Sequence, residues 1–206
     1  MAQQAKKQSN PKIPLIIDCA LEILRDHGEQ GLSMRKVATK AGMSLGNLQY
    51  YFRNKDELLA GVLDEYFGQC GDHYDAAVSR CRPEGRGEII HFLVTYGMDY
   101  ADSEIGKVFR ELWGIATRND SIKGHLHEYY HVYADEVAKV LAPFAKTSEA
   151  TAKAVSLLIP FYDGYGLISS PMPLNRQAMI EFLVDIVDST LEGNLGGCSF
   201  VALENE

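Results

Sequence analysis

The chain has 206 residues, of which 46% are hydrophobic, a composition typical of a folded globular protein rather than a disordered one. No apolar run reaches the roughly 18 residues that a membrane-spanning helix needs. The polar, basic start MAQQAKKQSNPK also lacks the apolar segment of a secretory signal. These features argue against an integral membrane protein and a secreted one, and we expect a cytoplasmic location.

The cysteines argue against two further classes of protein. The four thiols, Cys19, Cys70, Cys81 and Cys198, are scattered, and none belongs to a C-x-x-C pair. This spacing indicates neither a disulfide framework nor a zinc knuckle. Cys19 falls in an apolar helical stripe, so we expect it to be buried as a small hydrophobic residue.

Charge is distributed unevenly along the chain. The formal net charge is −8, but residues 1–55 contain nine Lys or Arg and four Asp or Glu, a net charge of +5. The remaining residues contain 11 basic and 24 acidic side chains, a net charge of −13. A basic N-terminal segment on an acidic body predicts that only this segment contacts a polyanion.

Helical patterns extend from one end of the chain to the other. Apolar residues repeat at helical spacing from Ile13 to Leu24 and stop at His27-Gly28, a plausible C-terminal cap. Asn54, followed three residues later by Glu57, is a capping-box pattern that begins a longer helix. Further amphipathic segments are expected near residues 86–101, 104–118, 121–143, 148–168 and 175–192. No strand-type alternation persists, so the predicted fold class is all-α.

The segment from Ser33 to Lys55 has the pattern of a helix-turn-helix. Ser33 can cap a short helix, Gly42 can adopt the left-handed backbone of a tight turn, and Ser44 can cap the next helix. Ala38 falls where the two helices would cross, where a small side chain allows close approach. The second helix of such a motif can enter the major groove of DNA.

One face of this second helix is expected to point outward and has little charge. Its residues are Ser44, Leu45, Gly46, Asn47, Gln49 and Tyr50. Amides and small groups suit the base edges of a DNA groove better than they suit a solvent-exposed surface.

The N-terminal segment resembles the DNA-binding domain of the TetR (tetracycline-repressor-like) family over residues 12 to about 60. The shared pattern is Gly–x₅–Leu–x–x–aromatic–Phe–x–x–Lys–x–x–Leu–Leu, represented by Gly42, Leu48, Tyr51, Phe52, Lys55, Leu58 and Leu59. The resemblance implies that bases are read by Arg35, Leu45, Gly46, Asn47 and Tyr50. It implies phosphate contacts from Ser33, Gln49, Tyr51 and Lys55. The family usually has an aromatic residue where this chain has Gln49, but an amide can also donate to phosphate.

The resemblance also implies a domain organisation and a function. We expect a disordered basic tail over residues 1–10, a helix-turn-helix domain over 11–55, a helical effector-binding and dimerisation domain over 56–193, and a loose tail over 194–206. The last two long helices would form the homodimer, with an apolar stripe on the final one: Met179, Phe182, Leu183, Ile186 and Val187. The implied protein is a repressor that a small-molecule effector releases from operator DNA. A partner protein in place of the small molecule is an open alternative.

Aromatic residues in the larger domain are the candidates for an effector site. They are Tyr96, Phe109, Trp113, Tyr133, Tyr162 and Tyr165, together with Asp163, which lies within an apolar helix. Trp113 and Tyr162 are the leading candidates. For any one of these residues, ordinary core packing is the competing interpretation.

Two Glu-x-x-His sequences, Glu88 to His91 and Glu128 to His131, make up half of a di-metal carboxylate signature. An all-helical metal-binding or enzymatic bundle is therefore the alternative function. The helical faces argue against it, because these residues lie on polar stripes opposite the apolar ones, whereas bundle ligands interrupt the apolar face. We therefore predict no metal, no cofactor and no enzymatic activity.

Overall fold

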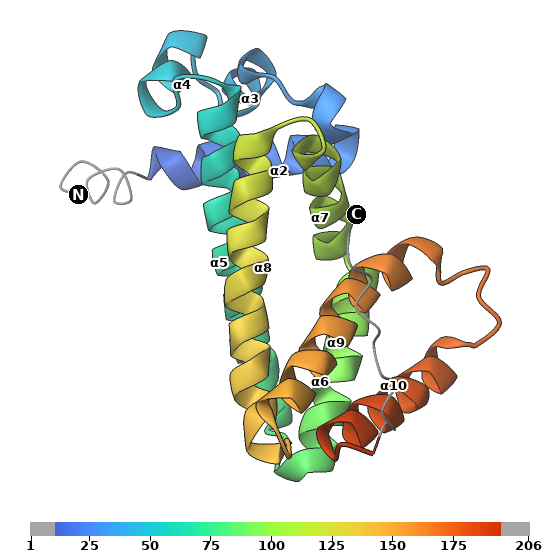
Figure 1. Ribbon diagram of the computed structural model, residues 1–206. Helices are drawn as coiled ribbons and strands as arrows, with labels where there is room; N and C mark the ends of the chain where they lie inside the picture. Colours follow the sequence, from blue (N-terminus) through green and yellow to red (C-terminus); the bar gives the residue numbers. More distant parts are fainter. Residues whose placement is uncertain (1–10, 195–206) are drawn as a thin grey trace, which may run out of the picture. The chain divides into compact units, whose positions relative to one another are not determined.

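The computed structural model describes residues 11–194, without the side chain of Ile105, and every regular element in this range is helical (Figure 1). The helices are α2 (Lys12–Gly31), α3 (Met34–Lys40), α4 (Leu45–Tyr51), α5 (Lys55–Cys81), α6 (Gly85–Asp102), α7 (Glu104–Ala116), α8 (Asp120–Leu141), the short 3₁₀ helix η1 (Ala142–Phe144), α9 (Ser148–Ile168) and α10 (Arg176–Leu191). None of them is long and apolar enough to span a membrane. The expected tails over residues 1–10 and 194–206, with Cys198, lie outside the described residues except for Asn194.

Three predicted caps are confirmed. The Ser33 hydroxyl accepts a hydrogen bond from the Lys36 N–H at 3.3 Å, and the Ser44 hydroxyl accepts one from the Asn47 N–H at 3.2 Å. The Asn54 side chain accepts from the Glu57 N–H at 2.8 Å and so begins α5. These bonds satisfy backbone donors that have no partner in the first turn of a helix.

The first predicted helix end needs a correction. Gly28 breaks α2 with φ 60° and ψ −169°, as expected of a glycine at a helix terminus, but a further helical turn follows and ends at Gly31. A Cβ atom at residue 28 would lie 2.9 Å from Glu111 Oε2 of α7. Glycine is therefore required here by the backbone conformation, whereas the Glu111 carboxylate could move away from a Cβ atom.

The chain divides into two compact units. The first contains residues up to Arg82 together with Asp99–Val132, and so includes α2 to α5, α7 and the first half of α8. Its core is continuous, with completely buried leucines contributed by these helices: Leu24, Leu48, Leu63, Leu112 and Leu126. The functional boundary expected at residues 55–56 falls at the start of α5, inside this unit, and it stays a prediction.

The second unit contains Pro83–Met98 and the chain from Tyr133 onward, which includes most of α6, the end of α8, α9 and α10. Tyr162 of α9 donates a hydrogen bond to the Leu93 carbonyl of α6 at 3.1 Å. Arg86 of α6 pairs with Asp188 at 2.7 Å and with Glu192 at 3.0 Å. These contacts join α6 to α9 and to the end of α10.

Part of the apolar stripe predicted on the last helix is buried inside the second unit. Leu183 and Val187 are buried within the unit, whereas Phe182 is 52% exposed. Only the exposed part of the stripe is available to a second subunit.

Candidate nucleic-acid interface

Helices α3 and α4 pack as the sequence predicts for a helix-turn-helix. Gly42 has a φ of 65°, in the left-handed region that the turn requires. The next residue, Met43, donates its N–H to the Ala38 carbonyl at 2.9 Å, which closes the turn. We call the N-terminal helices α2 to α4 and the start of α5 the head. Val37, Ala38 and Leu48 are buried in its core, so the opposite face of α4 points outward.

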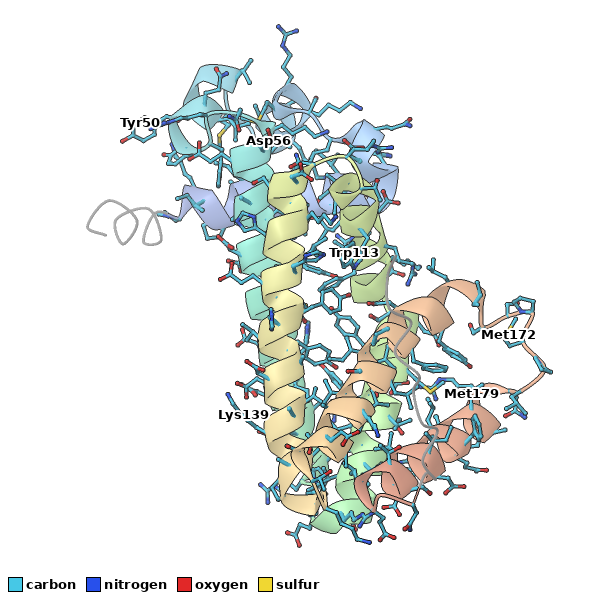
Figure 2. All side chains as sticks on the ribbon, in the orientation of Figure 1. Tyr50, Asp56, Trp113, Lys139, Met172 and Met179 are labelled. Carbon is cyan, nitrogen blue, oxygen red and sulfur yellow. The ribbon has the colours of Figure 1, made fainter. Side chains whose placement is uncertain are left out.

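The outward face of α4 presents an unusual exposed side chain. Tyr50 is 79% exposed, and its ring meets Tyr51 edge-on with 5.2 Å between centroids. Figure 2 shows Tyr50 at the outer edge of α4. No atom lies within 4 Å of a Cβ built on Gly46, and Leu45 and Asn47 are partly exposed beside it. The predicted base-reading residues of α4 therefore share one accessible surface, and Arg35 is exposed on α3.

The predicted phosphate-binding residues lie in more varied surroundings. Gln49 is exposed, whereas Tyr51 is only 8% exposed and belongs to the core of the head. The Ser33 hydroxyl is occupied as a helix cap, but its hydrogen remains able to donate to an anion. Lys55 Nζ lies 3.2 Å from Glu29 Oε1, so this cation already has a carboxylate partner.

A hollow between α2 and α3 adds positive charge to the same head. Its lining is Ile23, His27, Arg35, Lys36, Thr39 and Lys40. Lys40 pairs with Glu22 at 2.7 Å, and the hydrogen bond between them raises the pKa of Lys40 and lowers that of Glu22. Among the residues that line this hollow, Arg35 is also one of the predicted base-reading residues.

Phe109 and Trp113, two of the candidate effector residues, lie in the first unit within an aromatic cluster. Phe109 is buried, and Trp113, labelled in Figure 2, donates its Nε1–H to the Tyr130 hydroxyl at 3.3 Å. The cluster also contains aromatic residues that sequence analysis missed, namely Tyr66, Phe67, Tyr100, Tyr129 and Tyr130. The adjacent pairs Tyr66-Phe67 and Tyr129-Tyr130 are the sequence signal that could have found four of these five residues.

Hydroxyl and thiol groups are enclosed in this cluster. The Cys70 sulfur lies 3.3 Å from the Tyr100 hydroxyl. Burial raises the pKa of Cys70 to about 11 and raises the pKa of Tyr66 and of Tyr100 above their ordinary range. The thiol and the tyrosine hydroxyls of this cluster are therefore protonated at neutral pH, and the charged Arg110 guanidinium acts on Tyr66.

The remaining candidate effector residues, Tyr96, Tyr133, Tyr162, Asp163 and Tyr165, lie in the second unit. Tyr162 and Tyr165 are buried, and Tyr165 stacks on Phe161 with 5.4 Å between ring centroids. Tyr96 stacks on Phe92 at 5.8 Å. The seven predicted residues thus form two groups, one in each unit.

The two Glu-x-x-His sequences lie in different units. Glu88 accepts a hydrogen bond from the Glu84 N–H at 2.9 Å, which is a helix-capping contact, and His91 is exposed beside Thr95. Glu128 and His131 are both exposed on α8. Over residues 11–194 the side chains form no group of three or more His, Cys, Asp or Glu that could hold a metal ion.

Comparison with known proteins agrees with this arrangement. Residues 16–62 match the family model for bacterial regulatory proteins of the tetR family. An uncharacterized HTH-type transcriptional regulator in the dhlA 5′ region of Xanthobacter autotrophicus is 40% identical over 184 residues, which cover 87% of this chain and 90% of the relative. A nicotine-responsive repressor, HdnoR from Paenarthrobacter nicotinovorans, is 26% identical over 82% of this chain and 90% of its own length.

Solved structures share the fold over about 90% of the chain. A transcriptional regulator from Rhodococcus sp. Rha1 matches with a TM-score of 0.68 at 22% identity, covering 90% of this chain and 99% of the other. The multidrug binding protein EbrR, complexed with imidazole, matches with a TM-score of 0.65 at 22% identity, covering 89% of this chain and 96% of the other. The helix-turn-helix geometry, the family model and the 40% identical relative lead to one conclusion: the chain belongs to the TetR family of bacterial regulatory proteins and is a DNA-binding transcriptional regulator, not an enzyme.

Proposed function

We propose that this protein is a dimeric repressor that reads operator DNA through α4 and is released from it by a small-molecule effector. The observation that supports DNA reading most directly is the exposure of Tyr50. Its side chain is 79% exposed, whereas Leu48 and Tyr51 on the same helix are buried. A large aromatic side chain gains little by lying in water. In a DNA groove its ring can contact bases and its hydroxyl can form a hydrogen bond.

The DNA-binding test uses the intergenic DNA upstream of the protein's own gene. We expect selective binding whose affinity falls steeply with salt, because Lys and Arg displace counterions from the phosphates. Tyr50→Ala should weaken selective binding by about 1–3 kcal/mol, the usual cost of one lost base contact. Tyr74→Ala, a partly buried tyrosine in the second half of α5, is the control for loss of a tyrosine outside the helix-turn-helix. Equal binding of the wild type and Tyr50→Ala to every DNA sequence would contradict the proposal.

The proposed dimer forms through α9 and α10. Both helices carry exposed apolar side chains within the second unit: Leu157, Leu167 and Ile168 on α9 and Phe182 on α10. Large apolar side chains left exposed on two neighbouring helices support an association site there. A two-fold dimer would present two copies of α4 to two half-sites about one DNA turn apart.

Phe182→Glu tests this interface. Sedimentation should show a dimer for the wild type and a monomer for the variant, with helical circular dichroism retained and operator affinity reduced. Glu181→Gln is the control, since it changes the neighbouring exposed residue and should leave the dimer intact. A Phe182→Glu protein that remains dimeric would refute this interface.

The proposed effector site is the aromatic cluster around Phe109 and Trp113. Its aromatic side chains and partly buried hydroxyls favour an aromatic or apolar ligand with few hydrogen-bonding groups. Two relatives support this ligand class by name: HdnoR is nicotine-responsive, and EbrR has been solved with malachite green. Partly buried Trp113 is the only tryptophan of the chain, so its emission reports on this cluster alone.

Nicotine and malachite green are suitable first probes. A compound that acts here should shift the Trp113 emission and release DNA over the same concentration range. Release of DNA without any change in Trp113 emission would place the effector elsewhere, for instance in the second unit beside Tyr162.

A further inference from the structure

Glu29, near the end of α2, lies between two cations of the first unit. Its Oε1 atom lies 3.2 Å from Lys55 Nζ, and its Oε2 atom lies 2.8 Å from Arg118 Nη2. The hydrogen bond from Lys55 and the attraction of both cations hold the pKa of Glu29 below its ordinary value. Glu29 is therefore a charged carboxylate that links the first residue of α5 to the turn between α7 and α8.

A second contact joins the same two places. Asn119, the residue after Arg118, donates its side-chain amide to Asp56 Oδ1 at 2.9 Å. Asp56 follows Lys55 in the first turn of α5, where Figure 2 labels it. The α7–α8 turn therefore contacts the start of α5 directly through Asp56 and indirectly through the carboxylate of Glu29.

The segment that carries Glu29 is also held by α7. The Glu29 N–H donates to Glu111 Oε2 at 3.3 Å, directly after the break at Gly28. Phe109 and Trp113 also lie on α7, and Arg118 lies in the turn that directly follows this helix. Movement of α7 would therefore change the position of Glu29 and that of Arg118 together.

Lys55 is the residue that the family resemblance assigns to a DNA phosphate. A carboxylate and a phosphate oxygen compete for the same ammonium group, since both are anionic acceptors. While Glu29 neutralises Lys55, less positive charge remains for the DNA backbone. Arg118 competes with Lys55 for Glu29, and therefore weakens the hold of Glu29 on Lys55.

We propose that Glu29 is an internal competitor of the operator phosphate for Lys55, and that Arg118 in the α7–α8 turn sets the strength of this competition. Glu29 and Arg118 are positioning residues, because they act on DNA through Lys55. The inference rests on the proposed role of Lys55 in DNA binding and adds a route by which the α7–α8 turn alters DNA affinity.

The test measures operator binding across a salt series for the wild type, Glu29→Gln, Lys55→Gln and the double variant. Glu29→Gln should bind about two- to five-fold more tightly at each half-site, the range that the coupling of a surface ion pair allows. It should also steepen the salt dependence, with the slope of log K against log salt changing by about 0.9 per freed phosphate contact. In the Lys55→Gln background, Glu29→Gln should change neither the affinity nor the slope.

Each other outcome overturns the proposal. Unchanged or weaker binding by Glu29→Gln would mean that Glu29 orients Lys55 toward phosphate. An equal gain in DNA affinity from Glu29→Gln in the Lys55→Gln background would reflect only the removal of a negative charge. Glu22→Gln measures the size of that charge effect, because it removes a carboxylate that pairs with Lys40 rather than with Lys55. Tyr50→Ala, measured on the same DNA, separates failure of this inference from failure of DNA reading by α4.

Arg118→Gln keeps the proposal testable if Glu29→Gln does not fold. Without Arg118, the Glu29 carboxylate interacts more strongly with Lys55, and less of the Lys55 charge is available to phosphate. Arg118→Gln should therefore weaken DNA binding, and Arg118→Lys should restore it. Equal weakening in the wild-type and Lys55→Gln backgrounds would refute the role of Arg118. Thermal unfolding of each variant checks that the head remains folded over the temperature range of the binding assay.

Discussion

Replacing Gly97 by alanine should destabilise the second unit, because the ring of Tyr162 fills the space where a side chain would begin. A Cβ atom at residue 97 would lie 2.3 Å from both Cε2 and Cζ of Tyr162. Carbon atoms in favourable contact are about 3.5–4.0 Å apart, so the ring would have to move by more than 1 Å. Tyr162 is only 6% exposed, and its hydroxyl donates to the Leu93 carbonyl at 3.1 Å, so this movement would break a buried hydrogen bond.

The expected cost combines three contributions of similar size. Overpacking a filled core costs about 1–3 kcal/mol, and loss of the hydrogen bond costs about 1 kcal/mol. Alanine in the middle of α6 gains about 1 kcal/mol over glycine from helix propensity. The net loss should therefore be about 1–3 kcal/mol, which corresponds to a fall in Tm of about 2–12 °C for a chain of this size.

Denaturant unfolding followed by circular dichroism, at one protein concentration for all variants, measures this loss. Gly124→Ala is the matched control: Gly124 is a helical glycine of α8 with no atom within 4 Å of its would-be Cβ, so this substitution should be neutral or stabilising. In a Tyr162→Phe background, which has no hydroxyl to displace, Gly97→Ala should cost less by about the value of the hydrogen bond. A Gly97→Ala protein as stable as Gly124→Ala would refute the reasoning, since the ring could then not occupy the place described.

Three further predictions follow from buried groups and from strained backbone. Gly28→Ala should destabilise the fold by about 1–3 kcal/mol in thermal unfolding, because φ is 60° there and the new Cβ would meet Glu111; a neutral effect would contradict the conformation described for α2. Burial raises the pKa of Cys70 from 9.0 to about 11, so the unfolded chain loses this proton first. The free energy of unfolding should therefore fall as pH rises from 9 to 11, and Cys70→Ala should reduce that fall. Among the described cysteines, a thiol reagent should label exposed Cys81 in the native protein, whereas buried Cys19 and Cys70 should react only after unfolding; mass spectrometry of the labelled peptides checks this order.

Local sequence determined most of the secondary structure. Caps at Ser33, Ser44 and Asn54 depend on hydrogen bonds to residues three positions further along, so their chemistry is contained in a few neighbouring residues. The turn at Gly42 likewise depends on the conformational freedom of a single residue. These local rules, with the helical spacing of apolar residues, were sufficient to predict an all-helical chain and the helix-turn-helix.

Only the tertiary structure decided which of several equivalent residues are buried, paired or exposed. On α10 the sequence shows one apolar stripe, but packing within the second unit buries Leu183 and Val187 and leaves Phe182 exposed. Phe109 and Trp113 were predicted in one set with aromatic residues that lie in the second unit, whereas helix packing surrounds them with aromatic residues from α5 and α8. Helical periodicity indicates that a face is apolar, but it does not identify the face that covers it.

The contacts of Glu29 show the same limit for charged residues. Arg118 is 89 residues away along the chain and Lys55 is 26 residues away, so no local pattern relates them. Many acidic and basic residues lie on these helices, and the close pairs among them are selected by the way α2, α5 and α7 pack. Sequence therefore determined the fold class, the helix-turn-helix and the family, whereas the packing of helices distant in sequence determined which charged side chains contact one another.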